Sequence, residues 1–64
     1  MNVKQLKDLY RDSDSVCMMG IFDEQGKQLN EGCADDFADT RFDGREVLSY
    51  WVSCNVCLMV TLKD

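Results

Sequence analysis

Hydrophobic residues near the start of the chain recur at the spacing of an α-helix. The positions that share this spacing are Val3, Leu6, Leu9 and Tyr10. Asn2 and Gln5 form a capping box, in which each side chain accepts a hydrogen bond from the backbone N–H of the other residue. The polar side chains of residues 12–15 compete with the backbone for hydrogen bonds and should end the helix. The sequence therefore predicts a short amphipathic helix over residues 2–11.

The next apolar run, residues 16–22, predicts a strand. A turn with Gly26 at a positive φ should follow, and residues 27–29 are compatible with a short returning strand. Residues 31–42 place Phe37 and Ala38 among acidic side chains. This segment is compatible with a short helix near residues 34–39 or with an acidic loop.

The clearest strand pattern lies at the end of the chain, where two β-branched and aromatic runs predict a hairpin. The apolar residues of these runs are Val47, Leu48, Tyr50, Trp51 and Val52, then Val56, Leu58, Val60 and Leu62. A loop over residues 54–56 makes Ser53 face Cys57 and places the large aliphatic residues on one face. The pairs are Val52 with Leu58, Tyr50 with Val60, and Leu48 with Leu62. The other face then carries Trp51 near Met59 and Ser49 near Thr61, whereas a two-residue loop would mix the faces.

These elements predict a single α+β domain over residues 1–64. The short N-terminal helix should pack on one face of a three- or four-stranded, largely antiparallel sheet that ends in the C-terminal hairpin. A chain of 64 residues has room for one core and buries about 60% of the surface that its unfolded form exposes. Such a domain is marginally stable, so a disulfide, a metal ion or a homodimer interface is a reasonable expectation.

The net charge of −5 is confined to the middle of the chain. Residues 23–46 carry eight acidic and three basic side chains, whereas the two signs balance on either side of this segment. Such a cluster can imitate nucleic-acid phosphates and direct the domain to a basic groove of a nucleic-acid-binding protein. The alternative is a solvated face that keeps the protein in solution. The residues expected to contact a protein partner are Glu31, Asp35, Asp36, Asp39, Asp43, Glu46 and, on the hairpin, Trp51.

The sequence disfavours direct binding to nucleic acid, a membrane location and export from the cell. The seven basic residues form no stripe for phosphates, because three of them lie within the acidic segment. No stretch approaches the roughly 18 apolar residues of a membrane span. Met1 is not followed by a basic and then apolar leader, so we expect a cytoplasmic protein whose cysteines are reduced.

Two groups of residues raise the question of a metal ion. Four aspartates offer oxygen ligands for Ca²⁺ or Mg²⁺, but they lack the alternating acids and the closing Glu of an EF-hand loop. They are Asp35, Asp36, Asp39 and Asp43. Four cysteines could supply the thiolates of a structural zinc site: Cys17, Cys33, and the Cys-x-x-Cys pair Cys54 and Cys57. Only one such pair is present, so we expect cysteines that pack as small hydrophobic residues, and no cofactor.

Catalytic machinery is largely missing from the sequence. The chain has no His, hence no imidazole base for a Ser or Cys nucleophile, and it has no Gly-rich phosphate loop. A domain of this size also has little volume for a substrate pocket. We therefore expect no enzymatic activity.

Trp51 and Met59 should either form a dimer seam or partner-binding pocket, or be covered by residues 31–42.

Three short motifs resemble small acidic proteins carried by bacteriophages and other mobile elements. They are residues 1–9 (MNVKQLKDL), residues 12–16 (DSDSV) and residues 45–52 (REVLSYWV). In those proteins a short helix leads through an Asp-rich turn to a strand, and an acidic stretch precedes a hairpin. Small acidic products of such elements include anti-CRISPR proteins, so the resemblance implies a binding protein, although it carries over no functional residue.

The charge pattern and the resemblance together predict a non-enzymatic inhibitor of a bacterial defence nuclease, such as a Cas effector, in the cytoplasm of a bacterial host. The acidic segment would occupy the basic nucleic-acid groove of that nuclease. One alternative is a homodimeric interaction module that uses the apolar face of the hairpin. Another is a domain stabilised by zinc bound to the cysteines.

Overall fold

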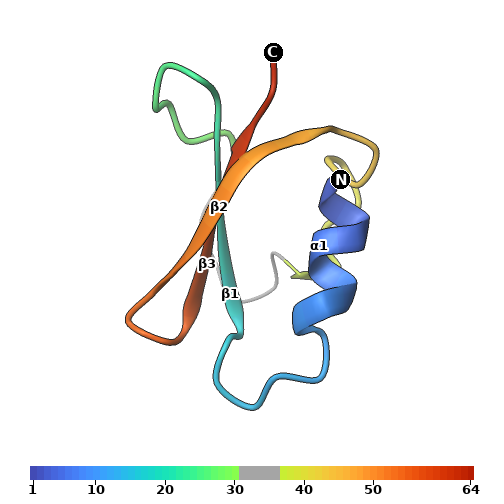
Figure 1. Cartoon of the computed structure of the whole chain (residues 1–64), viewed down its shortest axis with the longest axis vertical. Helices are drawn as coiled ribbons and strands as arrows, with labels where there is room; N and C mark the ends of the chain where they lie inside the picture. Colours follow the sequence, from blue (N-terminus) through green and yellow to red (C-terminus); the bar gives the residue numbers. More distant parts are fainter. Residues whose placement is uncertain (31–36) are drawn as a thin grey trace.

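The computed structural model describes residues 1–30 and 37–64, which contain one helix and three strands (Figure 1). Helix α1 (Val3–Tyr10) begins at the predicted capping box. The Asn2 Oδ1 atom accepts a hydrogen bond from the Gln5 N–H, and Gln5 Oε1 accepts one from the Asn2 N–H, both at 2.8 Å. The helix ends at Tyr10, just before the predicted polar run, in which Ser13 Oγ accepts a hydrogen bond from the Val16 N–H at 3.1 Å.

Helix α1 buries a slightly different face from the one that the spacing indicates. Val3 and Leu6 are fully buried, Lys7 is 3% exposed, and Leu9 is 65% exposed. With 3.6 residues per turn, Lys7 lies about 40° around the helix from Val3, whereas Leu9 lies about 120° away. Leu9 is therefore beyond the edge of the buried stripe, and a lysine occupies a position within it.

The strands form one sheet in the order β1-β3-β2, with β1 at Met18–Phe22, β2 at Val47–Ser53 and β3 at Cys57–Leu62. The α+β class and a three-stranded sheet are confirmed. The expectation of a largely antiparallel sheet is wrong, because β1 runs parallel to β3 and only β2 is antiparallel to it. The hairpin inserts β3 between the two earlier strands. Residues 23–46 therefore connect β1 and β2, which run in opposite directions on the two sides of β3.

The outer edge of β1 is covered by the segment that follows it. Gly26 has a φ of +86°, as predicted for the turn, and the chain returns beside β1. The returning residues form a single bridge between Phe22 and Gln28 and no separate strand. The buried side chain of Asn30 then acts as a further strand residue: it accepts from the Ile21 N–H at 3.0 Å and donates to the Met19 C=O at 2.8 Å.

The predicted hairpin register is confirmed over most of its length. Ser53 pairs with Cys57, Val52 with Leu58, and Tyr50 with Val60. The predicted pair of Leu48 with Leu62 is wrong, because an irregularity between Val47 and Ser49 makes Val47 the partner of Leu62. The extra residue shifts the alternation of the strand, so Val47 packs against the core and Leu48 is exposed.

The core lies between α1 and one face of the sheet (Figure 1). The buried hydrophobic residues are Val3, Leu6, Val16, Met19, Ile21, Leu58, Val60 and Leu62. In the described part of the acidic middle segment, Phe37 and Phe42 pack against this cluster. For residues 31–42 the sequence is compatible with either a short helix or a loop. Residues 37 and 38 of this segment form a 3₁₀ turn, and residues 31–36 lie outside the described residues. No helix of the described ranges is long and apolar enough to cross a membrane.

The hairpin turn contains the only non-glycine residues of the described ranges with positive φ, Cys54 (55°) and Asn55 (63°). The Val56 N–H donates to the Ser53 C=O at 3.2 Å and closes the turn. Positive φ at both central positions is typical of a type I′ turn, which favours Asn followed by Gly. Cys54 is therefore in a conformation that its Cβ disfavours.

We expect the combined change Cys54→Asn and Asn55→Gly to raise the free energy of unfolding by about 1 kcal/mol, because both residues then suit positive φ. Urea denaturation followed by circular dichroism measures the effect. Ser53→Gly is the matched control, since its φ is not positive and glycine there should lower the free energy of unfolding by roughly 0.5–1 kcal/mol. A destabilised Asn-Gly variant would show that the turn has a different geometry.

Candidate functional site

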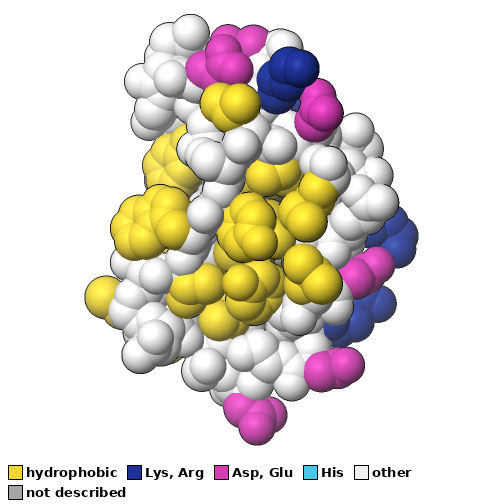
Figure 2. Space-filling view, viewed as in Figure 1, with side chains coloured by type: hydrophobic (Ala, Val, Ile, Leu, Met, Phe, Trp, Pro, Cys, Tyr) yellow, Lys and Arg dark blue, Asp and Glu magenta, His cyan; other side chains and the backbone are white. Residues whose placement is uncertain are grey.

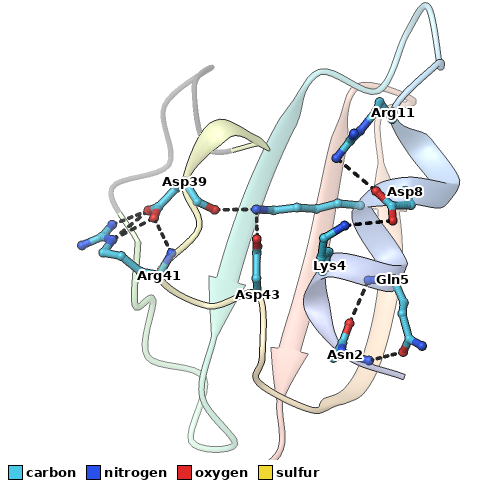
Figure 3. A network of polar contacts seen from close by, with 9 residues as sticks. Asn2, Lys4, Gln5, Asp8, Arg11, Asp39, Arg41 and Asp43 are labelled. Carbon is cyan, nitrogen blue, oxygen red and sulfur yellow. Dashed lines mark hydrogen bonds and ion pairs between the residues drawn. The ribbon is translucent and has the colours of Figure 1, made fainter.

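Within the described residues, two of the acidic candidates, Asp39 and Asp43, pair with cations of the chain itself. Asp43 Oδ1 lies 2.6 Å from the Nζ atom of Lys7, whose side chain is 4% exposed. The same amine donates to the backbone C=O of Asp39 (Figure 3). A buried ammonium group needs such partners, because its transfer from water costs several kcal/mol. Asp43 therefore serves the fold by neutralising Lys7.

Backbone hydrogen bonds hold the same segment against the start of α1. The first N–H groups of a helix have no partner within the helix. Here the Val3 N–H donates to the Arg45 C=O at 3.0 Å, and the Lys4 N–H donates to the Asp43 C=O at 3.1 Å. Together with the ion pair of Lys7, these bonds fix the position of residues 43–45 on the helix (Figure 3).

Asp39 is paired with a cation of its own segment. Its carboxylate accepts hydrogen bonds from the Arg41 side chain, with the shortest N···O distance at 2.6 Å, and from the Arg41 backbone N–H at 2.9 Å (Figure 3). These hydrogen bonds lower the pKa of Asp39 to about 2. The stabilisation from this group is therefore complete above the pKa of an unfolded Asp, near 3.9, and is lost only as the pH falls toward 2.

Among the remaining acidic candidates, only Glu46 lies within the described residues. Glu46 is exposed and lies 3.5 Å from the Nζ atom of Lys63. Glu31, Asp35 and Asp36 lie outside the described residues. Each of the three described candidates thus has a cationic partner within the chain, which reduces the negative charge that it presents to another molecule.

The cysteines of the described ranges are free, and the backbone brings three of them to one end of the sheet. The Cys17 N–H donates to the Val56 C=O at 3.0 Å, beside the turn that contains Cys54 and precedes Cys57. Cys17 and Cys54 are exposed, whereas half-buried Cys57 places Sγ 3.4 Å from Met59 Sδ. Within the part of the chain that the structure describes, no group of three or more His, Cys, Asp and Glu side chains converges on a metal-sized site. Cys33 lies outside that part.

A hollow of about 280 Å³ lies at the C-terminal end of α1. Its lining includes Lys7, Tyr10, Arg11 and Phe37. The amine of Lys7 already donates to Asp43 and Asp39, and the guanidinium of Arg11 lies 3.0 Å from Asp8. Both cations are therefore engaged by carboxylates or carbonyls of the described chain.

Strand β2 exposes large hydrophobic side chains, and two of them, Leu48 and Tyr50, were expected on the covered face. Leu48 is 54% exposed, Tyr50 43% and Trp51 60%. Tyr50 and Trp51 are adjacent and point to opposite faces of the sheet, so both faces of this strand are open. In Figure 2 hydrophobic side chains gather across the middle of the view, over β2 and toward α1, and charged side chains lie around the margin.

Of these residues, only Trp51 was a candidate from the sequence. Leu48 and Tyr50 were expected on the covered face, but α1 has only eight residues and covers β1 and β3 better than β2. The second expectation for Trp51, that residues 31–42 cover it, does not hold for the described residues of that segment, because Phe37 and Phe42 pack against the core. The one sequence signal for this surface is the absence of charge from residues 47–53.

The ion pair of Lys7 and Asp43 predicts how substitutions at these two positions change the free energy of unfolding. Asp43→Asn should lower the free energy of unfolding by about 2–4 kcal/mol, because it leaves a buried ammonium group without its counter-ion. Lys7→Met should cost less, since Asp43 is 23% exposed and water can solvate its carboxylate. The double variant should then resemble Lys7→Met alone.

Urea denaturation of the three variants completes a double-mutant cycle. Asp8→Asn is the matched control, because Asp8 pairs with Lys4 at 3.5 Å on an exposed helix surface, where the loss should stay below about 0.5 kcal/mol. Strictly additive effects of the Lys7 and Asp43 changes would contradict the proposed coupling.

The chain was compared with protein-family models, curated proteins and solved structures, and none of them matches. The resemblance to mobile-element proteins therefore stays an expectation that rests on short motifs. The function is therefore inferred from the surfaces of the chain itself.

Proposed function

We propose that this chain is a non-catalytic protein-binding module whose contact surface consists of the exposed hydrophobic residues of β2. The observation that carries the proposal is the exposure of Leu48, Tyr50 and Trp51 within four consecutive positions of one strand. Contiguous apolar surface with a polar margin is typical of protein interaction sites. Tyr and Trp are also the residue types that contribute most to binding energy at such sites.

The arrangement of this surface supports binding to a protein more than to a small molecule. The exposed side chains lie on an open strand and do not surround the hollow beside α1. Small-molecule sites are concave and enclose most of the ligand. A strand that presents apolar side chains on both faces instead suits a partner that packs across it.

The test of this proposal is capture of a partner by tagged protein from a bacterial lysate that also contains untagged copies of the chain. Leu48→Ser with Trp51→Ser should lower the affinity by about 2 kcal/mol, roughly thirtyfold, because it removes apolar contacts at the centre of the surface. Val56→Ser is the matched control, since Val56 is 41% exposed at the hairpin turn and outside the surface.

At a concentration too low for association, both variants should keep the melting temperature of the parent protein, because substitutions at exposed positions change stability by about 0.5 kcal/mol or less. Equal retention of the captured protein by the double variant and by the parent would contradict the proposal. So would the failure of the parent to retain either another protein or its own untagged copy.

A second candidate function is inhibition of a nucleic-acid-binding nuclease, such as a Cas effector, and it is supported by the location of the net charge. All of the charge of −5 belongs to residues 23–46. Since Asp39 and Asp43 have cationic partners, this candidate depends mainly on Glu31, Asp35 and Asp36. A negative surface of this kind would compete with nucleic acid for a basic groove.

For this candidate, we expect the combined change Glu31→Gln, Asp35→Asn and Asp36→Asn to weaken inhibition of a susceptible nuclease at least about tenfold, and to flatten its dependence on salt. The measurement is cleavage by a panel of purified Cas nucleases at increasing salt. The control removes the same charge elsewhere through Asp12→Asn, Asp14→Asn and Asp64→Asn. Equal effects of the two triple variants, or no inhibition by the parent protein, would rule out a specific acidic site.

A further inference from the structure

The two edges of the sheet differ in whether the chain covers them. The outer edge of β1 bonds to the backbone of Leu29, at 2.7 Å from Ile21, and to the side chain of Asn30. Among the described residues, the outer edge of β2 is bonded at its start, where the Val47 N–H donates to the Met1 C=O at 2.8 Å. Beyond this bond, no backbone group of residues 1–30 or 37–64 pairs with that edge.

Strand β2 also lacks most of the features that prevent an edge from pairing with another strand. Natural edges are usually protected by lysine, proline, a bulge or a covering loop. Residues 47–53 (VLSYWVS) contain neither a charged residue nor proline or glycine. The irregularity between Val47 and Ser49 lies at the start of the strand and leaves the stretch from Ser49 to Ser53 regular.

We propose that the partner of the β2 surface is a second copy of this chain, which pairs antiparallel with it along the open edge. This inference rests on the proposed function, and it names the partner of that surface. A two-fold axis would place β2 of one copy against β2 of the other and join the two sheets into one of six strands. With the axis at Tyr50, Leu48 of each copy faces Val52 of the other, and Ser49 faces Trp51.

The distribution of charge permits an identical partner on this edge. The net charge of −5 on each copy opposes association, but a strand without charged side chains adds no local repulsion where two copies meet. Strand β2 provides such a stretch, and no register of β2 against itself places two charged side chains opposite each other. Beside the strand, Glu46 and Lys63 form a pair of opposite signs, so the margin does not present one sign only.

The small size of the domain also favours association of two copies. One eight-residue helix covers one face of the sheet, and the large apolar side chains of β2 stay exposed in the single chain. Pairing of two β2 strands would bring Leu48, Tyr50 and Trp51 of each copy beside those of the other. Small domains commonly gain the burial that their own core lacks through oligomerisation.

The test is sedimentation equilibrium of the purified chain from roughly 1 μM to 1 mM, together with amide hydrogen exchange at both ends of that range. We expect a reversible dimer in which amides of β2 exchange more slowly at the higher concentration. Ser49→Lys should raise the dissociation constant about tenfold or more, since it places a lysine on the edge of each copy without removing an apolar contact. Val56→Lys adds the same charge at the hairpin turn and should leave the constant within about threefold of the parent.

Salt provides a second readout. Because the two copies carry charge of the same sign, increasing the salt from about 0.01 M to about 1 M should tighten the dimer roughly threefold or more. A chain that stays monomeric near 1 mM overturns the inference, as does a dimer that tolerates Ser49→Lys or shows no added protection in β2. In either case, capture of a different protein that is lost in the Leu48 and Trp51 variant would leave the proposed function standing.

Discussion

Strand β3 pairs with β1 on one side and with β2 on the other, and this central position determines most of the structure. Its inward residues Leu58, Val60 and Leu62 are fully buried, and α1 packs on the face that they form. Because β3 separates β1 from β2, the other two strands become edges. Leu29 and Asn30 then cover the edge at β1, whereas the described residues leave most of the edge at β2 without a backbone partner.

The features that the sequence predicted well are those that neighbouring residues determine. The capping box joins residues three positions apart, and the hairpin register follows from the loop length and the alternation of side chains. For the same reason, the turn at Gly26 and the end of the helix just before the polar run of residues 12–15 were predictable. In each case the interacting groups are close in sequence, so the pattern contains the information that the fold uses.

The features that were mispredicted depend on residues far apart in the chain. The parallel pairing of β1 with β3 joins Met19 to Leu58, and no local pattern reports the direction of such a pair. Lys7 is buried because Asp43, 36 positions later, neutralises it, and the spacing of hydrophobic residues cannot reveal this. Of the candidate site, the sequence predicted Trp51. Leu48 and Tyr50 were missed because their exposure depends on which strand the helix covers.

The acidity of the chain and its exposed apolar strand have different physical roles. Asp39 and Asp43 are used within the fold, where their partners Arg41 and Lys7 hold the middle segment against α1. The unpaired share of the negative charge opposes the approach of a second copy and favours close contact at surface without charge. Association through β2 would therefore be selective, and it would also stabilise the fold, since any partner that binds only the folded state shifts the folding equilibrium by mass action. In a chain of 64 residues with so small a core, binding and stability would then depend on the same residues.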